Sequence, residues 1–312
     1  MADPLLADGT QIELRSLISL RQEAARLDLS PRSKVLATRS GGHLSPFRGR
    51  GVEFDESRVY LRGDDPRNMD WRVTARTGKP YVKLFREERE RPVWLLVDIG
   101  PGMRFGTRVA FKSVIAAKAA ALLAWAASDN GDRVGGLVFD ESRQFEQRPL
   151  ARTAGLLPLL RALSGTPMPG QQGGHSSLGS AATRLAQQVR HGSLVFLLSD
   201  FAGLSMKDDS WLGRLARGSE VVLVRVYDPL EAEAPEAGQY PVSDGEHCSV
   251  LDTSRDVVQQ HWNGLFAERT KLLSTLVQRH GIHHFELRTD KPVGESLYQG
   301  LLPRPRISRG TL

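Results

Sequence analysis

The stretch Val93-Trp-Leu-Leu-Val-Asp98-Ile-Gly100-Pro-Gly102 decides the fold class of this chain of 312 residues. Residues 93–97 are apolar without interruption, which is typical of a strand buried on both faces of a parallel sheet. An aspartate and two closely spaced glycines follow directly, and this composition indicates a tight turn. The stretch therefore predicts a central strand that presents a carboxylate at its end.

Strand-like and helix-like segments alternate after this stretch. Strands spaced by helices predict an α/β fold, a doubly wound and mostly parallel sheet of the Rossmann type over residues 92–312. Residues 228–249 are rich in Glu, Ala, Pro and Gly, which indicates an insertion with a small hairpin. Apolar runs and helical spacing predict strands at 93–98, 133–139, 143–148, 193–199, 220–226 and 282–287, and helices at 107–128, 151–163, 177–190, 210–217 and 255–280.

The first 91 residues form a separate region in this interpretation. We expect an N-terminal helix over residues 10–29, followed by a β-rich or irregular subdomain with short strands at 51–54, 58–61 and 80–85. Residues 32–91 hold fifteen Lys or Arg and nine Asp or Glu, and this difference of +6 equals the net charge of the whole chain. A basic segment suits nucleic acid or an acidic protein surface. Its mixture of signs is typical of a folded segment held by internal ion pairs.

Composition places the chain among ordinary globular proteins, with 40% hydrophobic and 25% charged residues. The single Cys248 can form no internal disulfide, which fits a reducing compartment. No apolar run reaches the ~20 residues that a membrane-spanning helix needs. The start Met1-Ala-Asp-Pro has neither the basic nor the apolar part of a secretory leader. We therefore expect a cytoplasmic protein without a membrane segment.

Three aspartates are expected at one edge of the predicted sheet. Asp98, Asp200 and Asp228 each follow a predicted strand directly. The carboxyl ends of parallel strands lie at a common edge, and ligands of open α/β sheets bind there. This edge is the candidate site of the chain.

The turn at Asp98 resembles the first loop of a von Willebrand factor A-type domain. In that family an Asp-x-Ser-x-Ser loop, a threonine from a second loop and an aspartate from a third hold a divalent cation that a partner's carboxylate completes. Here Asp98 matches the first position, Gly100 and Gly102 stand in place of the serines, and Asp200 matches the last aspartate. The second loop corresponds to residues 173–177, with His175 in place of the threonine. The resemblance implies a degenerate metal site of Asp98, His175 and Asp200, and a partner-binding face made of Asp98, Gly100, Gly102, His175, Ser176 and Asp200.

Three interpretations of this edge stay open. Two aspartates and water can hold Mg²⁺ weakly, since this ion keeps part of its hydration shell. Without a metal, two neighbouring carboxylates need a cation, and His175 or Arg104 can supply it. In the third interpretation the aspartates accept backbone hydrogen bonds and cap their loops.

A second resemblance lies in the basic segment. The residues Glu53, Phe54, Tyr60, Gly63, Asp64, Asp65, Arg67, Asp70, Trp71, Ala75 and Arg76 resemble the signature of the DUF58 family. This resemblance implies an A-type core and a partner ATPase of the MoxR type, a class of AAA+ proteins. We expect Arg62, Arg67, Arg72 and Arg76 to pair with Asp64, Asp65 and Asp70, and Trp71 and Phe54 to anchor the segment to the sheet. In the alternative interpretation the charged and aromatic residues of the segment form a docking surface for a partner.

Motifs of several enzyme classes are missing from the sequence. There is no phosphate-binding Gly-x-x-x-x-Gly-Lys loop, no Gly-x-Gly-x-x-Gly turn, no Gly-x-Ser-x-Gly elbow and no His-Glu-x-x-His pair. We therefore expect a non-enzymatic interaction scaffold that acts as adaptor of a MoxR-type ATPase in the assembly or maturation of another protein complex. One alternative is nucleic-acid binding through the Arg-rich segment 32–91. The other is a metal-dependent hydrolase at Asp98, His175 and Asp200.

Overall fold

The computed structural model describes residues 9–29, 52–61, 64–87, 90–165, 172–173, 177–243 and 247–302. The chain divides into two compact units. The larger unit comprises Met1–Ser33 and Arg91–Leu312, and the smaller unit comprises Lys34–Glu90.

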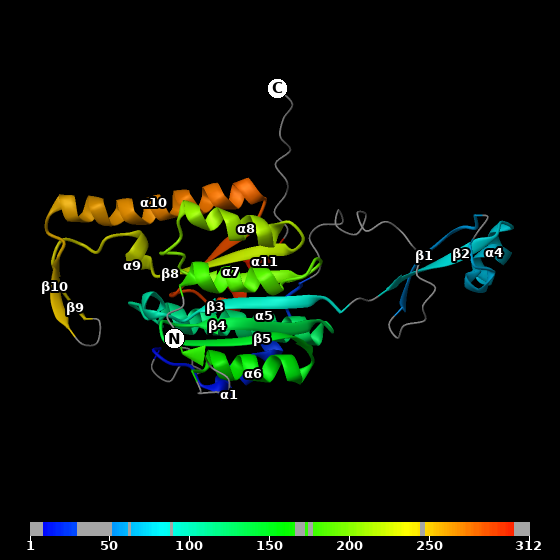
Figure 1. Ribbon diagram of the computed structural model, residues 1–312, viewed down its shortest axis with the longest axis horizontal. Helices are drawn as coiled ribbons and strands as arrows, with labels where there is room; N and C mark the ends of the chain where they lie inside the picture. Colours follow the sequence, from blue (N-terminus) through cyan, green and yellow to red (C-terminus); the bar gives the residue numbers. More distant parts are fainter. Residues whose placement is uncertain are drawn as a thin grey trace, which may run out of the picture. The chain divides into compact units, whose positions relative to one another are not determined.

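The larger unit is built on a mostly parallel sheet of seven strands with the order β11-β8-β7-β3-β4-β5-β6 (Figure 1). All neighbours from β11 to β4 are parallel, whereas β5 and β6 are antiparallel additions. The predicted α/β class with a mostly parallel sheet is therefore confirmed. The strands are β3 (Pro92–Asp98), β4 (Arg133–Phe139), β5 (Arg143–Ala151), β6 (Gln172–Gly173), β7 (Leu194–Ser199), β8 (Glu220–Tyr227) and β11 (His283–Arg288).

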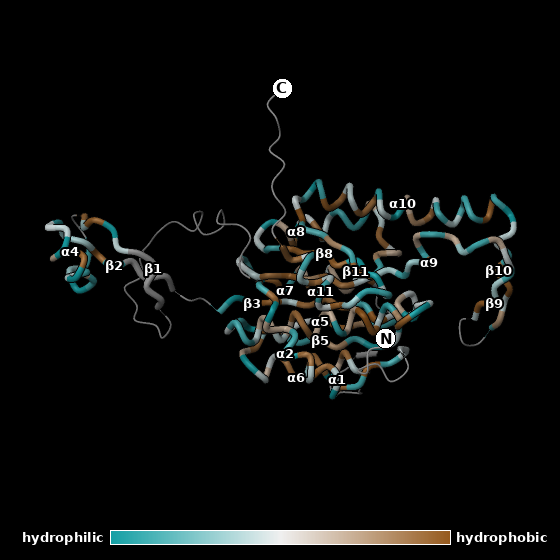
Figure 2. Tube along the Cα trace, turned by 180° about the vertical axis from the view of Figure 1, so that it is seen from behind, coloured by the Kyte–Doolittle hydropathy of each residue, from teal (hydrophilic) through white to brown (hydrophobic). Residues whose placement is uncertain are grey.

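Helices cover both faces of this sheet. Five contribute to one apolar core: α1 (Leu14–Ser19), α2 (Arg21–Ala24), α5 (Lys112–Asp129), α6 (Thr153–Leu163) and α11 (Val293–Leu301). The opposite core is closed by α7 (Leu178–Gln188), α8 (Asp209–Ala216) and α10 (Asp256–His280). Figure 2 shows hydrophobic residues along the central strands of the unit. Of the helices in the described part of the chain, none is long and apolar enough to cross a membrane.

Helix α5 is the central helix of its layer. Fifteen of its 18 residues are buried, because α2, α6 and α11 pack around it as well as the sheet. A helix surrounded in this way is apolar on every side, and its many alanines let the neighbouring helices approach closely. The helix begins at Lys112 rather than at the predicted residue 107.

The N-terminal helix belongs to the α/β unit, which corrects the predicted division at residue 91. Leu17, Leu20 and Ala24 are buried in the same core as α5, and the indole Nε1 of Trp125 donates a hydrogen bond to the Leu17 carbonyl at 3.0 Å. The helix expected over 10–29 is also shorter, since it consists of α1 and α2. The apolar residues of α1 and α2 pack against α5 and α6.

The predicted excursion after β8 holds three elements. They are the short helix α9 (Pro229–Ala232) and a hairpin of β9 (Gln239–Ser243) and β10 (Cys248–Asp252). The hairpin and the first turns of α10 project beyond the end of the sheet where β8 ends (Figure 1). We call the hairpin together with residues 256–265 the arm.

The smaller unit is a hairpin with a helix. Strand β1 (Val52–Val59) pairs with β2 (Tyr81–Glu87) in antiparallel register, and the connection holds the 3₁₀ turn η1 (Pro66–Asn68) and the helix α4 (Trp71–Thr77). This helix was not predicted. Asp70 caps it by accepting hydrogen bonds from the backbone N–H groups of Arg72 and Val73, both at 3.1 Å, and Gly78 ends it in the left-handed conformation (φ 70°).

Candidate functional site

The end of β3 brings the predicted aspartates and glycines together. Oδ1 of Asp98 accepts a hydrogen bond from the N–H of Gly100 at 2.9 Å, and Oδ2 accepts one from the Ser199 hydroxyl at 2.7 Å. A Cβ atom on Gly102 would lie only 3.2 Å from Oδ2 of Asp200, so glycine allows this close approach. Because β3 and β7 are neighbours, the carboxylates sit where the strand order reverses, and open α/β sheets bind ligands at this point.

The backbone after Asp200 is strained. Phe201 has φ 54°, a conformation that non-glycine residues rarely adopt, and its side chain is buried. The turn lets the N–H of Ala202 donate to Oδ1 of Asp200 at 2.9 Å and that of Phe201 donate to the Ser199 hydroxyl at 3.1 Å. Strain of this kind persists only where the surroundings fix it, and it concentrates at functional sites.

A buried lysine supplies the cation of this edge. Nζ of Lys112 lies 2.8 Å from Oδ2 of Asp200 and 2.7 Å from Oε1 of Glu231, and the lysine is only 1% exposed. The sequence-based candidates were His175 and Arg104. Arg104 instead pairs with Glu141 at 3.3 Å, and His175 and Ser176 lie outside the described residues.

Sequence reasoning missed Lys112, although one signal was present. The lysine opens α5, where the positive end of the helix dipole disfavours a cation. A buried ammonium group at this position needs anionic partners from elsewhere in the chain. Glu231 meets this need from 119 residues further along the chain.

Glu231 is held by its own short helix. It forms a capping box with Asp228, whose N–H donates to Oε2 of Glu231 at 2.9 Å. The indole of Trp262 on α10 donates to the carbonyl of Leu230 at 2.7 Å. The position of Glu231 is therefore coupled to the first half of α10, which belongs in part to the arm.

Asp228 fixes the loops around the edge without being exposed itself. Its carboxylate accepts hydrogen bonds from the hydroxyls of Thr107 (2.7 Å) and Thr289 (2.6 Å) and from the N–H groups of Thr107 and Leu230, both at 3.0 Å. Burial opposes its ionisation, but the hydrogen bonds from Thr289 and Thr107 outweigh this and hold the pKa of Asp228 below its usual range. The two contacts with Thr107 tie the loop before α5 to the end of β8.

Asp98 shows the opposite shift. Burial raises the pKa of Asp98, and the nearby negative charge of Asp200 adds to this effect. The hydrogen bonds from Gly100 and Ser199 and the charge of Lys112 oppose it in part. Asp98 is therefore the carboxylate of this edge whose negative charge is least well compensated.

The described residues at this edge do not fit a divalent cation. Mg²⁺ needs oxygen ligands arranged around it, whereas the facing oxygens of Asp200 and Glu231 hold the ammonium group of Lys112. Both oxygens of Asp98 accept hydrogen bonds. Within the described ranges, no three His, Cys, Asp or Glu side chains gather closely enough to hold a metal. We call Asp98, Lys112, Ser199, Asp200 and Glu231 the carboxyl-edge cluster.

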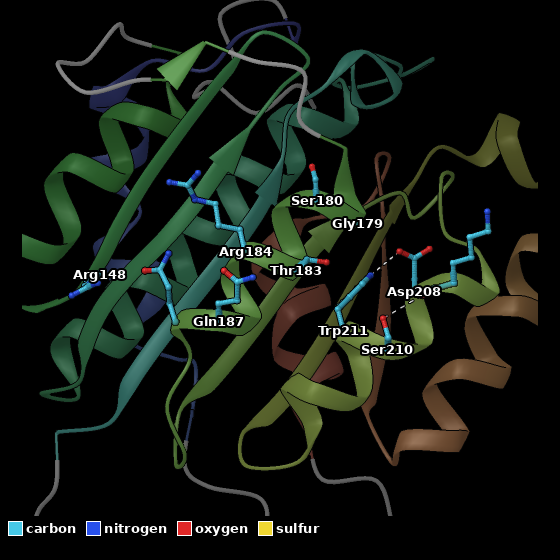
Figure 3. Close-up of a pocket in the computed structure, with 11 residues that line it drawn as sticks. Arg148, Gly179, Ser180, Thr183, Arg184, Gln187, Asp208, Ser210 and Trp211 are labelled. Atoms are coloured by element: carbon cyan, nitrogen blue, oxygen red, sulfur yellow. Dashed lines mark hydrogen bonds between the residues drawn. The ribbon is translucent and has the colours of Figure 1, made fainter.

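A polar groove lies apart from this cluster, beside α7 and α8 (Figure 3). It has a volume of about 790 Å³, and Ser180, Thr183, Arg184 and Trp211 are among the residues that line it. Nε1 of Trp211 donates to Asp208 at 2.7 Å, and Arg184 pairs with Glu146. No member of the carboxyl-edge cluster lines the groove.

Comparison with known proteins assigns the family. Residues 56–270 match the family described as "Protein of unknown function DUF58". The chain belongs to the DUF58 family. Two relatives of this DUF58 protein are the uncharacterized proteins Mb1516 of Mycobacterium bovis (strain ATCC BAA-935 / AF2122/97) and Rv1480 of Mycobacterium tuberculosis (strain ATCC 25618 / H37Rv). Each is 33% identical over 235 residues, which cover 74% of this chain and 72% of the relative.

Two solved structures are similar to part of the DUF58 protein. One is a conserved hypothetical protein BatB from Bacteroides thetaiotaomicron, with 17% identity and a TM-score of 0.41 over 67% of this chain and 96% of that chain. The other is an aerotolerance-related membrane protein from Bacteroides fragilis NCTC 9343, with 15% identity and a TM-score of 0.41 over 67% of this chain and 97% of that chain.

The signature segment of this DUF58 protein is held differently from the prediction. The only ion pair between its arginines and aspartates within the described ranges joins Arg58 and Asp64 at 2.7 Å. Asp64 accepts the N–H of Leu61, Asp65 accepts that of Arg67, and Asp70 caps α4. The expected pairing of Arg67, Arg72 and Arg76 is therefore wrong, since these carboxylates are used by the backbone.

Other predicted features of the segment have separate outcomes. Trp71 is 69% exposed and does not anchor its own unit. Gly63, Arg62 and the side chains of Glu53 and Phe54 lie outside the described residues.

Proposed function

We propose that this DUF58 protein is a non-enzymatic interaction scaffold whose carboxyl edge recognises a partner protein. The observation that carries the proposal is the buried ammonium group of Lys112 between Asp200 and Glu231. It occupies the edge at the switch point of the sheet, where a ligand or cation is expected. The chain thereby carries its own counter-ion at the place where chemistry with a metal or substrate would begin.

The strand order supports an A-type domain as the scaffold. The six main strands follow the order 3-2-1-4-5-6, when β3 is counted as the first strand. Asp98 ends β3 and Asp200 directly follows β7, the two strands at the switch point. The resemblance to A-type domains implies carboxylates at these positions. We propose that Lys112 replaces the metal ion of such domains.

The arm supplies additional surface for a partner. Val242, Val250 and Val257 on the arm are 44%, 62% and 75% exposed. Val242 and Val250 lie on opposite faces of the hairpin, since Val242 pairs with Ser249 and Val250 with Pro241, so a partner can contact an exposed apolar side chain on either face. We propose a MoxR-type AAA+ ATPase as the partner and another protein complex as the client, with both interactions in the cytoplasm.

Binding to a purified MoxR-type ATPase from the same organism tests this proposal. The full chain is compared with Asp98→Ala, with the arm variant Val250→Asp/Val257→Asp, and with Leu150→Asp as a control for a change at an exposed apolar residue elsewhere. We expect the arm variant to weaken binding at least tenfold, the control to leave it unchanged, and EDTA without nucleotide to have no effect. Absence of binding by the wild type would remove the ATPase as partner. Unchanged binding by both Asp98→Ala and the arm variant, with both folded, would remove the carboxyl edge as the binding face.

The alternative of a metal-dependent hydrolase at Asp98, His175 and Asp200 stays a prediction. The contacts of Asp98 and Asp200 do not favour it.

A further inference from the structure

Helix α4 of the smaller unit presents a face that the unit itself does not use. At about 100° per residue, the positions of Trp71, Arg72, Ala75 and Arg76 form one continuous face of the helix. All four residues are exposed, whereas Val73 and Thr74 on the opposite face are half-buried. Thr74 accepts a hydrogen bond from the N–H of Tyr81 at 3.0 Å, so that opposite face is fixed to β2.

The exposed face is held rigidly. Asp70 caps the helix and also accepts the hydroxyl of Ser57 from β1 at 2.7 Å. The N–H of Asp70 donates to the carbonyl of Tyr81 at 2.7 Å. A short helix tied to both strands loses little conformational entropy when a partner binds to it.

The arginines of this face are free because the aspartates are occupied. Asp65 and Asp70 accept hydrogen bonds from backbone N–H groups, and Asp64 forms an ion pair with Arg58. The guanidinium groups of Arg67, Arg72 and Arg76 have no ion-pair partner in the described part of the chain. Three guanidinium groups without an ion-pair partner therefore lie within five residues of Trp71 in the sequence, and Trp71 is 69% exposed.

We propose that Trp71, Arg72 and Arg76 form a docking surface for an acidic protein partner. Trp, Tyr and Arg are the residues that most often dominate the free energy of protein interfaces, and guanidinium groups without an ion-pair partner can form bidentate pairs with the carboxylates of a partner. The unit as a whole has thirteen basic and nine acidic residues between 34 and 90, with the signs interleaved. Nucleic-acid binding favours a surface of one sign, so an acidic protein surface with a recess for the indole is the better complement. The surface lies on a different unit from the carboxyl edge, and the proposal does not rest on the proposed function.

Selection of peptides on the full chain tests the docking surface. A random peptide library displayed on phage is selected against the immobilised chain, and the enriched peptides are labelled for fluorescence anisotropy. We expect peptides with clustered Asp or Glu beside a large apolar residue. Trp71→Ala and Arg72→Glu/Arg76→Glu should each weaken binding at least about 30-fold, the size of effect that defines an interface hot spot.

Matched variants keep the test decisive. Arg72→Lys/Arg76→Lys retains the charge and should retain most of the binding, and Arg161→Glu, an exposed arginine on α6, should leave it unchanged. Circular dichroism tests whether each variant is folded. We expect folded variants because the substituted residues are exposed. The proposal is overturned if no acidic peptide is enriched, or if the peptides bind Trp71→Ala and the charge-reversed variant as tightly as the wild type. It is also overturned if a single-stranded oligonucleotide binds through the same arginines and acidic peptides do not.

Discussion

Replacing Lys112 by methionine tests the central feature of the site. Methionine keeps much of the length and apolar volume of the lysine side chain and removes its charge. Breaking a buried ion pair from one side costs about 3–5 kcal/mol, because the remaining charge stays buried. Asp200 and Glu231 are 12% and 21% exposed in their side chains, so water can reach them in part. We therefore expect a loss of about 2–4 kcal/mol in the free energy of unfolding, somewhat below that range.

Urea and thermal unfolding followed by circular dichroism measure this loss. For a unit of this size each kcal/mol shifts Tm by about 2–4 °C, so the expected decrease is about 4–16 °C. Lys207→Met, a change at an exposed lysine, serves as control and should stay within about 0.5 kcal/mol of the wild type. Adding Glu231→Gln to Lys112→Met should recover part of the loss, since one of the two uncompensated carboxylates is removed.

Divalent cations give a second, independent readout. In Lys112→Met the oxygens of Asp200 and Glu231 become free to bind a cation, so Mg²⁺ should raise the Tm of this variant and not that of the wild type. A destabilisation below about 1 kcal/mol would show that the ion pairs do not stabilise the edge. A wild-type protein that melts at a lower temperature in EDTA would refute the assignment of Lys112 as the cation.

Three further predictions concern individual side chains. Because burial raises the pKa of Asp98, its ionisation costs stability as pH rises through the folded-state pKa. The free energy of unfolding of Asp98→Asn should therefore rise relative to that of the wild type as pH increases from acidic to neutral. Urea unfolding at several pH values measures this difference, and a difference that does not change with pH would contradict the raised pKa. Asp228→Ala leaves the donors of Thr107, Leu230 and Thr289 without an acceptor and should cost about 3–5 kcal/mol; a loss below 1 kcal/mol in the same assay would contradict this role. Leu17→Ala should cost about 2–5 kcal/mol in the unfolding of the α/β unit, whereas no change would show that the N-terminal helices are not part of its core.

The central sheet could be predicted because burial leaves a direct trace in the sequence. The expected bounds of β3, β4, β7, β8 and β11 agree with the observed ones to within about one residue. The first four strands are mainly apolar runs between turn residues, whereas β11 has only Phe285 and Leu287 in alternating, buried positions. Three helices in the described part of the chain were not predicted: α4, α9 and α11. Helix α11 holds two glycines, and α4 lies between turn-forming residues, so intrinsic propensity does not favour either helix. Packing of Val293, Leu297 and Leu301 stabilises the first, and the Asp70 cap stabilises the second.

The site could be predicted only as far as its aspartates. Asp98 and Asp200 follow strands directly, so the topology alone places them at one edge. The cation could not be found in this way, because Lys112 meets Asp200 across 88 residues and Glu231 across 119. For Lys112 the sequence analysis missed ion pairs, whereas for the arginines of the smaller unit it predicted ion pairs that do not form. Proximity in sequence to Asp64, Asp65 and Asp70 predicted ion pairs, but backbone N–H groups compete for the same carboxylates.

Lys112 gives the carboxyl edge a positive charge that belongs to the covalent structure of the chain. A bound ion enters and leaves by mass action, so the occupancy of its site follows the free concentration of that ion in the surroundings. The ammonium group of Lys112 is covalently attached, so it occupies its place whenever the chain is folded, whatever the concentration of free ions. The charge at this edge would therefore be the same in cells with high or low concentrations of free magnesium or calcium. The signal that changes it must then come from a competing carboxylate or from movement of the segment that carries Glu231, and not from ion fluxes.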